Sequence, residues 1–231
     1  MIYVTSDLHG YPFPKFKELL AKASFGDDDF LFILGDVIDR GGDGADYLKW
    51  LLVQPNAELI RGNHEDMLLA CSFLFDEITE QSVRGLNASR MQLLQNWMRN
   101  GAEPTIRGLS RTDPETRADI LQYLRETPLY DTVSVGDRDY LLTHSGLGNF
   151  QAGKKMREYS LHDLLWNRPL ISDAYSADFV TVFGHTPTCC YGKEYSGKMI
   201  RTDTWIDVDT GVSYGLHPML LRLDDEKEFY V

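Results

Sequence analysis

The sequence predicts an α/β fold in which two packed, mixed β-sheets are flanked by helices. Strand-like and helical segments alternate in the first third, as in β-α units whose parallel strands are joined by right-handed crossovers. The middle third contains helical segments without a strand candidate, and short strands joined by turns occupy the last third. With 231 residues and 43% hydrophobic content, we expect a single domain over residues 1–231 with a helical insertion at about 66–127.

The first third has the clearest alternation. Apolar runs that end near Thr5, Leu34 and Ile60 are the expected strands. Between them, residues 14–23 and 45–53 place apolar side chains at helical spacing, and the first of these helices opens with a proline. The segment therefore predicts three parallel strands connected by two helices.

The middle third changes to a helical pattern. Residues 66–78, 89–100 and 114–126 are the expected helices, and residues 101–107 are expected to form a loop between two of them. We expect these helices to lie beside the functional site.

The last third returns to strands. Residues 132–135 and 140–143 predict a hairpin, and residues 179–183 predict a further buried strand. More strands are expected within 199–209 and 217–223, joined by a glycine-containing turn.

Five of the apolar runs end in residues that bind metals. In open α/β sheets, sites gather at the carboxyl ends of strands, so we expect these side chains to meet. Divalent transition ions at a hydrolytic centre bind carboxylate, imidazole and amide oxygen ligands, and a pair of ions needs one ligand that bridges them. The residues with these groups are Asp7, His9, Asp36, Asn63, His144 and His185.

The central segment Gly35-Asp36-Val37-Ile38-Asp39-Arg40-Gly41 presents two carboxylates and a guanidinium together. A carboxylate can hold a divalent ion while the planar guanidinium of Arg40 binds phosphate oxygens in bidentate fashion. This segment therefore predicts a metal site next to a bound phosphate.

Composition excludes several classes of function. The net charge of −12 argues against a nucleic-acid or anionic-membrane surface, and there is no apolar run of about 18 residues that could span a bilayer. Three cysteines give no even set of disulfide partners, and Asp7 follows Met1 too closely for a cleavable signal. We therefore expect a cytoplasmic protein.

The motifs, in order, resemble the signature of the metal-dependent phosphoprotein phosphatase (PPP) family, which has the calcineurin-like metallophosphoesterase fold. The matching segments are Asp7-Leu8-His9-Gly10, Gly35 to Gly41 as above, Arg61-Gly62-Asn63-His64-Glu65, His144 and Gly184-His185-Thr186-Pro187. Trp166-Asn167-Arg168 is similar to the bacterial and phage branch that includes the phage lambda phosphatase. The resemblance extends from Ile2 to about Gly211.

The resemblance implies a role for each matched residue. One ion would be held by Asp7, His9 and Asp36, and the second by Asp36, Asn63, His144 and His185, so that Asp36 bridges. The usual assay ion for this branch is Mn²⁺, and Fe, Zn or another divalent ion is also compatible. His64 corresponds to the general acid and Asp39 to the carboxylate that orients it. The phosphate-binding arginines would be Arg40, Arg61 and Arg168.

The expected function is hydrolysis of phosphate monoesters on serine or threonine, and also tyrosine, by direct attack of a metal-bridging hydroxide. The expected partner is then a phosphoprotein or phosphopeptide, and a monomer is compatible with the sequence. An alternative is a symmetrical diadenosine tetraphosphate hydrolase, which shares the metal centre, and a third reading is a metal-bound scaffold without turnover. Glu65 and Thr186 favour the phosphatase, because the nucleotide hydrolases tend to have Asp and Trp at these places.

Four further residues are expected to be structural. Cys189 and Cys190 follow the His185 loop and are interpreted as small residues at a strand end, and His162 and His217 match no motif.

Overall fold

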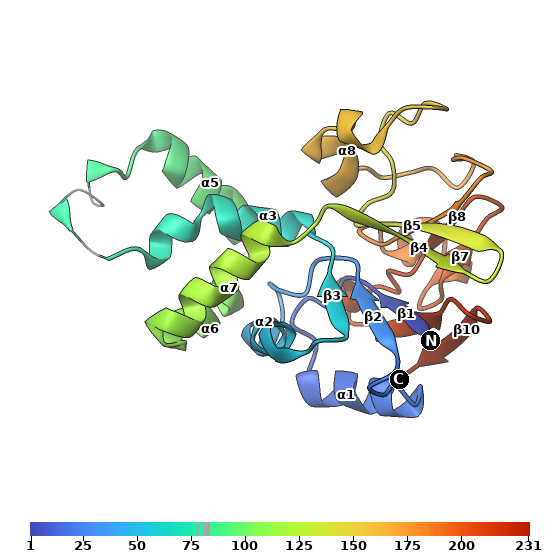
Figure 1. The fold of residues 1–231 in the computed structure, drawn as a ribbon. Coiled ribbons are helices and arrows are strands. Elements are labelled where there is room, and N and C mark those ends of the chain that lie inside the picture. Colours follow the sequence, from blue (N-terminus) through green and yellow to red (C-terminus); the bar gives the residue numbers. More distant parts are fainter. Residues whose placement is uncertain (78, 81–83) are drawn as a thin grey trace.

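The computed structural model describes residues 1–77, 79–80 and 84–231. Within these residues, two five-stranded sheets with strand orders β10-β9-β1-β2-β3 and β4-β5-β6-β8-β7 form the centre of the molecule (Figure 1). The first sheet contains β1 (Ile2–Thr5), β2 (Phe30–Ile33), β3 (Ala57–Leu59), β9 (Met219–Arg222) and β10 (Lys227–Tyr230). The second contains β4 (Tyr130–Val135), β5 (Arg138–Thr143), β6 (Val180–Phe183), β7 (Ile200–Arg201) and β8 (Trp205–Asp207). The predicted fold class is confirmed.

Each sheet contains three neighbouring parallel strands. In the first sheet β1 pairs in parallel with β2, and β2 with β3. In the second sheet β5 pairs in parallel with β6, and β6 with β8. Because the carboxyl ends of parallel strands lie at one edge of a sheet, the residues that follow these six strands are brought to the same side.

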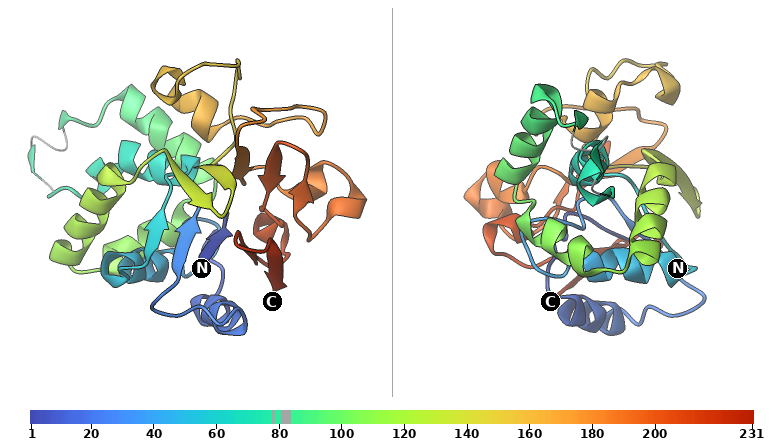
Figure 2. Two further views of the ribbon diagram at one scale, coloured as in Figure 1. Left: turned by 45° about the vertical axis from the view of Figure 1, so that its right-hand side comes forward. Right: turned by 90° about the vertical axis from the view of Figure 1, so that its left-hand side faces the viewer.

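Side chains alternate between the two faces of each strand, and this places apolar residues in separate layers of the core. In β1, Tyr3 points to the helices α1 (Phe13–Lys22) and α2 (Gly44–Val53), whereas Val4 belongs to the core between the two sheets. Leu142 of β5 and Val182 of β6 meet Val4 in that core. Successive strand residues point to opposite faces, so both faces of each sheet are apolar, with helices outside (Figure 2).

The helices of residues 63–126 lie on one side of the molecule, opposite β9 and β10 (Figures 1 and 2). They are α3 (Asn63–Ala70), α5 (Ala88–Arg99), α6 (Glu103–Arg111) and α7 (Pro114–Glu126), together with a 3₁₀ turn at Ser72–Phe75. The predicted helices 89–100 and 114–126 agree with α5 and α7 to within a residue. The predicted helix 66–78 is shorter, because α3 ends at Ala70, and its last residue, Ile78, lies outside the described residues.

The prediction of a loop over residues 101–107 is wrong, because α6 occupies most of it. Pro104 stands in the first turn, where its missing N–H costs no helical hydrogen bond. Gly108 lies against α2, and a Cβ there would be only 2.9 Å from the Cβ of Ala45. Pro104 thus allows this helix to begin, and Gly108 allows it to pack closely against α2.

The last third also differs in detail from the prediction. Residues 199–209 contain two antiparallel strands, β7 and β8. The strand β10 and the short helix α8 (Leu161–Leu165) were not predicted. Further 3₁₀ turns lie at Met156–Glu158, Thr188–Cys190, Lys193–Tyr195 and Val212–Tyr214. In the part of the chain that the structure describes, none of the helices has the length and apolar character needed to cross a membrane.

Candidate metal centre and active site

The backbone at the strand ends adopts a strained conformation. Nine non-glycine residues in the described part of the chain have positive φ, and six of them belong to the predicted site, with φ between 42° and 69°. Such conformations are uncommon for residues with a Cβ and cluster at functional sites. Backbone hydrogen bonds between neighbouring loops hold them, since Asp7 N donates to Gly35 O (3.1 Å) and His9 N to Asp36 O (2.8 Å). The six residues are Asp7, His9, Asp36, Asp39, Arg40 and His185.

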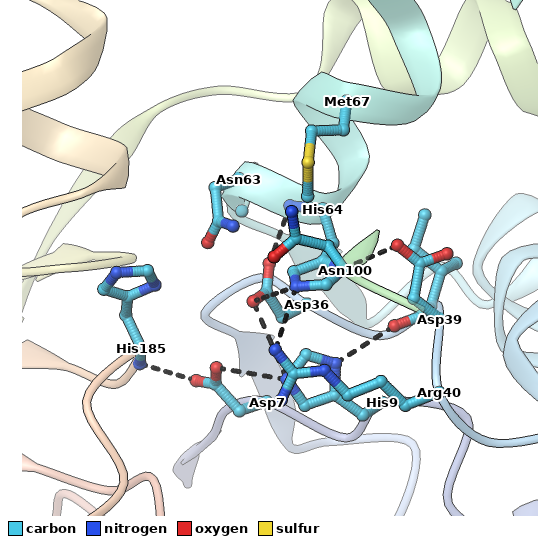
Figure 3. A network of polar contacts seen from close by, with 12 residues as sticks. Asp7, His9, Asp36, Asp39, Arg40, Asn63, His64, Met67, Asn100 and His185 are labelled. Carbon is cyan, nitrogen blue, oxygen red and sulfur yellow. Dashed lines mark hydrogen bonds and ion pairs between the residues drawn. The ribbon is translucent and has the colours of Figure 1, made fainter. Parts of the chain in front are cut away.

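The ligand atoms of the predicted metal-binding residues converge on Asp36. Two groups of possible ligands, His9–Asp36–His64 and Asp36–His144–His185, each have their ligand atoms within 4.8 Å of one another. The two groups share Asp36, which lies between the first-sheet loops and His185 in Figure 3.

The two other expected ligands lie at the same place. The Oδ1 atom of Asn63 is 2.8 Å from Nε2 of His144, and Oδ1 of Asp7 is 3.8 Å from Nε2 of His9. The structure therefore brings together all six residues expected to bind metal, and it adds His64 to their neighbourhood.

The donor set fits a pair of divalent ions. Nε2 of His185 is buried and has no hydrogen-bond partner among the described residues, as expected of an atom reserved for a ligand. Burial lowers the pKa of His9 to about 3 and that of His185 well below its usual range, and the neutral imidazole is the form that binds metals. Burial and the neighbouring Asp7 raise the pKa of Asp36, and a cation at this place would favour its ionised form.

Glu65 connects the two central loops. Its fully buried carboxylate accepts hydrogen bonds from the backbone N–H groups of Asp36 (2.8 Å), Val37 (3.0 Å) and Gly62 (2.9 Å). Gly62 in turn lies against Asp36, and a Cβ at this glycine would be 2.2 Å from Asp36 Oδ1. In the sequence, Glu65 served only to distinguish branches of the family, but its position in the first turn of α3 makes it a support for Asp36.

A hydrogen-bonded network positions His64. Nδ1 of His64 lies 2.5 Å from Oδ2 of Asp39, so the carboxylate assigns the proton to Nδ1 and leaves Nε2 facing the site. The helices of the middle third hold Asp39: Trp97 Nε1 donates to Oδ2 (2.7 Å) and Thr105 Oγ1 donates to Oδ1 (2.5 Å). Asp39 N donates to Thr105 Oγ1 (2.8 Å). Neither Trp97 nor Thr105 was among the expected site residues.

Burial is the largest cause of the pKa shifts of Asp39 and His64 in this network. Burial raises the pKa of Asp39 to about 6, although the hydrogen bonds from Thr105 and Trp97 and the charge of Arg40 act in the opposite direction. Burial, followed by Arg40, lowers the pKa of His64 well below its usual range. Nη2 of Arg40 lies 3.3 Å from Nε2 of His64 (Figure 3).

A pocket of about 100 Å³ opens above the ligand atoms. Two of the three arginines expected to bind phosphate, Arg40 and Arg168, line it. Arg61 is not among its lining residues, because its Nη2 donates to the carbonyl oxygens of Arg125 (2.8 Å) and Thr127 (3.1 Å) at the end of α7. The carbonyl groups at a helix C-terminus have no partner within the helix, and they bind this guanidinium. The phosphate-binding role expected for Arg61 is therefore not supported by the geometry.

The pocket also contains residues that the sequence analysis missed. Asp209 follows the parallel strand β8 and lines the pocket, and burial followed by the charge of Asp7 raises its pKa well above the usual range. The apolar pair Trp205-Ile206 just before it has the same design as the other strand ends, so this residue could have been found. Asn100, Ser213 and Tyr214 also line the pocket, and they have no such pattern.

The comparison with protein families finds one match. The profile described as calcineurin-like phosphoesterase matches residues 1–203. This range contains the ends of β1, β2, β3, β5 and β6, from which the expected metal ligands come.

Curated relatives share a single name. Symmetrical bis(5'-nucleosyl)-tetraphosphatases of Buchnera aphidicola and Chromobacterium violaceum are 39% identical over 70 residues and 33% identical over 102 residues, respectively. The matched segments are 29% and 42% of this chain, and 25% and 36% of the relatives. The relative from Acidovorax is 27% identical over 148 residues, 63% of this chain and 44% of its own length. The matches thus span less than half the length of these relatives.

Solved structures share the fold. A protein assigned as a diadenosine tetraphosphatase superposes with a TM-score of 0.67 and 17% identity over all of this chain and 92% of its own. A protein serine/threonine phosphatase from Saccharomyces cerevisiae has a TM-score of 0.55 and 17% identity, over all of this chain and 78% of its own. At these identities the likeness is one of fold.

The preference for a protein phosphatase, and with it the expectation of a phosphoprotein or phosphopeptide partner, is wrong, since the curated relatives are named as nucleotide hydrolases. The physical reason lies in the residues used to choose. Glu65 accepts hydrogen bonds from three backbone N–H groups, and Thr186 is buried. Neither residue therefore indicates which substrate the site binds. The residues expected to bind metal were the same under both readings of the sequence, so they could not decide between them.

Proposed function

The chain belongs to the calcineurin-like phosphoesterase family, and from that premise we propose that it hydrolyses a phosphoanhydride bond in dinucleoside polyphosphates. Cleavage in the middle of a dinucleoside tetraphosphate adds one water across a P–O bond and releases two nucleoside diphosphates. The proposal of a hydrolase rests on one observation. Two groups of possible metal ligands share Asp36, and they lie at the base of a pocket that contains Arg40 and Arg168. The names of the curated relatives support the choice of substrate.

We assign the expected ligands to two ions. Asp7, His9 and Asp36 would hold one ion, and Asp36, Asn63, His144 and His185 would hold the other. The chemistry that such ions supply when bound is a water of lowered pKa and neutralisation of charge on the phosphate. We propose Mn²⁺ as the assay ion.

The pocket residues would bind and polarise the phosphate chain. Arg40 and Arg168 offer fixed guanidinium donors, which bind phosphate oxygens well and stabilise the charge that develops on them. His64 would donate its Nε2 proton to the leaving oxygen, while Asp39 keeps the other proton on Nδ1. Burial, followed by the charge of Arg40, lowers the pKa of His64, and a phosphate anion bound at Arg40 would act in the opposite direction.

The test is the product pattern from diadenosine tetraphosphate with Mn²⁺. Symmetrical cleavage yields ADP alone on ion-exchange chromatography, whereas asymmetric cleavage yields AMP and ATP. Asp36→Asn and a chelator-treated sample are the controls. Turnover of p-nitrophenyl phosphate without any cleavage of the dinucleotide would reject the substrate, and an inert protein that binds two ions would reject the hydrolase.

Three finer assignments belong with this proposal. Trp166-Asn167-Arg168 supports a place near the phage-lambda-like branch, and Arg168 of this segment lines the pocket. The free state of all three cysteines in the described chain supports a reducing, cytoplasmic setting. We also propose that residues 1–231 act as one domain, because Trp97 and Thr105 of the helical insertion hold Asp39 of the metal centre.

A further inference from the structure

A second cavity of about 500 Å³ adjoins the metal pocket. The two share His9, Arg40 and Ser213 among their lining residues, so a molecule bound through phosphate at Arg40 can extend from one cavity into the other. The second cavity lies between the loop after β1, the loop after β2 and the segment from Val212 to His217. Its volume is in the range of small-molecule sites, about 300 to 1,000 Å³.

The wall of this cavity combines rings with aliphatic groups. Tyr11 and His217 meet edge to face, with ring centroids 6.0 Å apart, and the Tyr11 hydroxyl lies 3.0 Å from Nδ1 of His217. Tyr11 is buried while His217 is exposed. Val212 and Leu216 add apolar surface to the same wall. A flat, weakly polar ring is the kind of group that such a wall accommodates.

The cavity is lined by side chains of opposite charge. Arg40 stands where it joins the metal pocket, and Asp43 lines it as well. Oδ2 of Asp43 accepts a hydrogen bond from Phe13 N (2.8 Å), which leaves its other oxygen as an acceptor. A carboxylate repels phosphate and accepts hydrogen bonds from hydroxyl groups. The anionic end of a ligand is therefore directed to Arg40, and a neutral, hydroxyl-bearing end to Asp43.

We propose that this cavity, the nucleoside pocket, binds the base and ribose of one half of the substrate, and that His217 supplies the ring against which the base stacks. The identity of the ligand rests on the proposed function. Stacking of a base on an aromatic side chain is favourable for every base, because each has a π-face. The pocket thus favours nucleotides over simple phosphate esters without selecting one base.

The experiment compares three activities in variants that leave the metal centre unchanged. His217→Ala removes the stacking ring, and Gly42→Phe fills the pocket, since a Cβ at Gly42 meets no atom within 4 Å. His162→Ala removes a histidine that is exposed on α8 and serves as the matched control. The readouts are the Kd of ADP by equilibrium dialysis with Mn²⁺, KM and kcat for diadenosine tetraphosphate, and kcat/KM for p-nitrophenyl phosphate, which has no nucleoside.

We expect His217→Ala to raise the Kd of ADP and the KM for the dinucleotide about tenfold, the loss of one stacking contact, with kcat and p-nitrophenyl phosphate turnover unchanged. Gly42→Phe should weaken both nucleotides more strongly, and His162→Ala should resemble the wild type. Dinucleotide cleavage with wild-type KM in both pocket variants would overturn the nucleoside pocket and leave the proposed function intact.

The experiment also distinguishes a failure of the proposed function from a failure of the nucleoside pocket. If the wild type binds ADP in a His217-dependent way but cleaves no dinucleotide, the pocket stands and the proposed function falls. If the wild type binds no ADP, the assignment of this cavity as a nucleoside pocket is rejected.

Discussion

Replacing Thr105 with valine tests whether the helical insertion contributes to catalysis. The change is nearly isosteric and removes only the hydroxyl that donates to Asp39 Oδ1 and accepts from Asp39 N. Both atoms of Asp39 then lose a partner in a fully buried position. An unsatisfied buried polar group costs about 1 to 3 kcal/mol, so with two such groups the free energy of unfolding should fall by about 2 to 6 kcal/mol.

The pH dependence of activity should change as well. Ionised Asp39 holds the Nδ1 proton of His64, so activity should fall as pH drops through the pKa of Asp39, about 6 in the wild type. A lost donor disfavours the ionised carboxylate and raises that pKa further. We expect the acidic limb of the kcat/KM profile to move upward by about one pH unit, since one unit is about 1.4 kcal/mol and a hydrogen bond to a charge is of that size.

The assay is the pH profile of aryl phosphate hydrolysis with Mn²⁺. The effect should be larger for phenyl phosphate than for p-nitrophenyl phosphate, because the more basic leaving group depends more on a general acid. Thr112→Val removes another hydroxyl from the end of the same helix, one that donates to Gly108 O, and should leave the profile unchanged. An equal loss of rate at every pH for both esters would refute the reasoning and reduce Thr105 to a structural residue.

Three further outcomes are expected. Asp36→Asn should lose both ions by elemental analysis, and two ions per chain with full activity would contradict the shared ligand. Gly62→Ala should lower metal content and activity, because its Cβ would displace Asp36 Oδ1, whereas Gly26→Ala, which has open space, should not. Asp207→Asn should gain stability relative to the wild type as the pH rises above about 4, the ordinary pKa of an aspartate, in urea titrations of metal-free protein. Burial raises the pKa of Asp207, so its stabilising proton is lost as pH rises, at about 1.4 kcal/mol per unit. An unchanged difference across that range would argue against a raised pKa.

The order of the residues is sufficient to predict the architecture and the place of the candidate metal centre. Each expected ligand directly follows an apolar run of strand length, and the strands that carry them are parallel. Their carboxyl ends therefore meet at one edge of each sheet, and the packing of the two sheets brings the two edges together. The rule placed Asp36 with Asp7 and Asn63 at the edge of the first sheet. It placed His144 and His185 at the edge of the second, and it would also have found Asp209 after β8.

The residues that surround that centre depend on how the helices and strands pack together, which the sequence pattern does not show. Trp97 and Thr105 reach Asp39 from 58 and 66 residues away, and the direction of Arg61 depends on where α7 ends. The nucleoside pocket likewise joins Tyr11 to His217, 206 residues apart. No periodicity in the chain records such contacts, because they arise when separately formed elements pack together. Substrate choice belongs to this second kind of information, since it depends on the walls around the metals and not on the ligands that hold them.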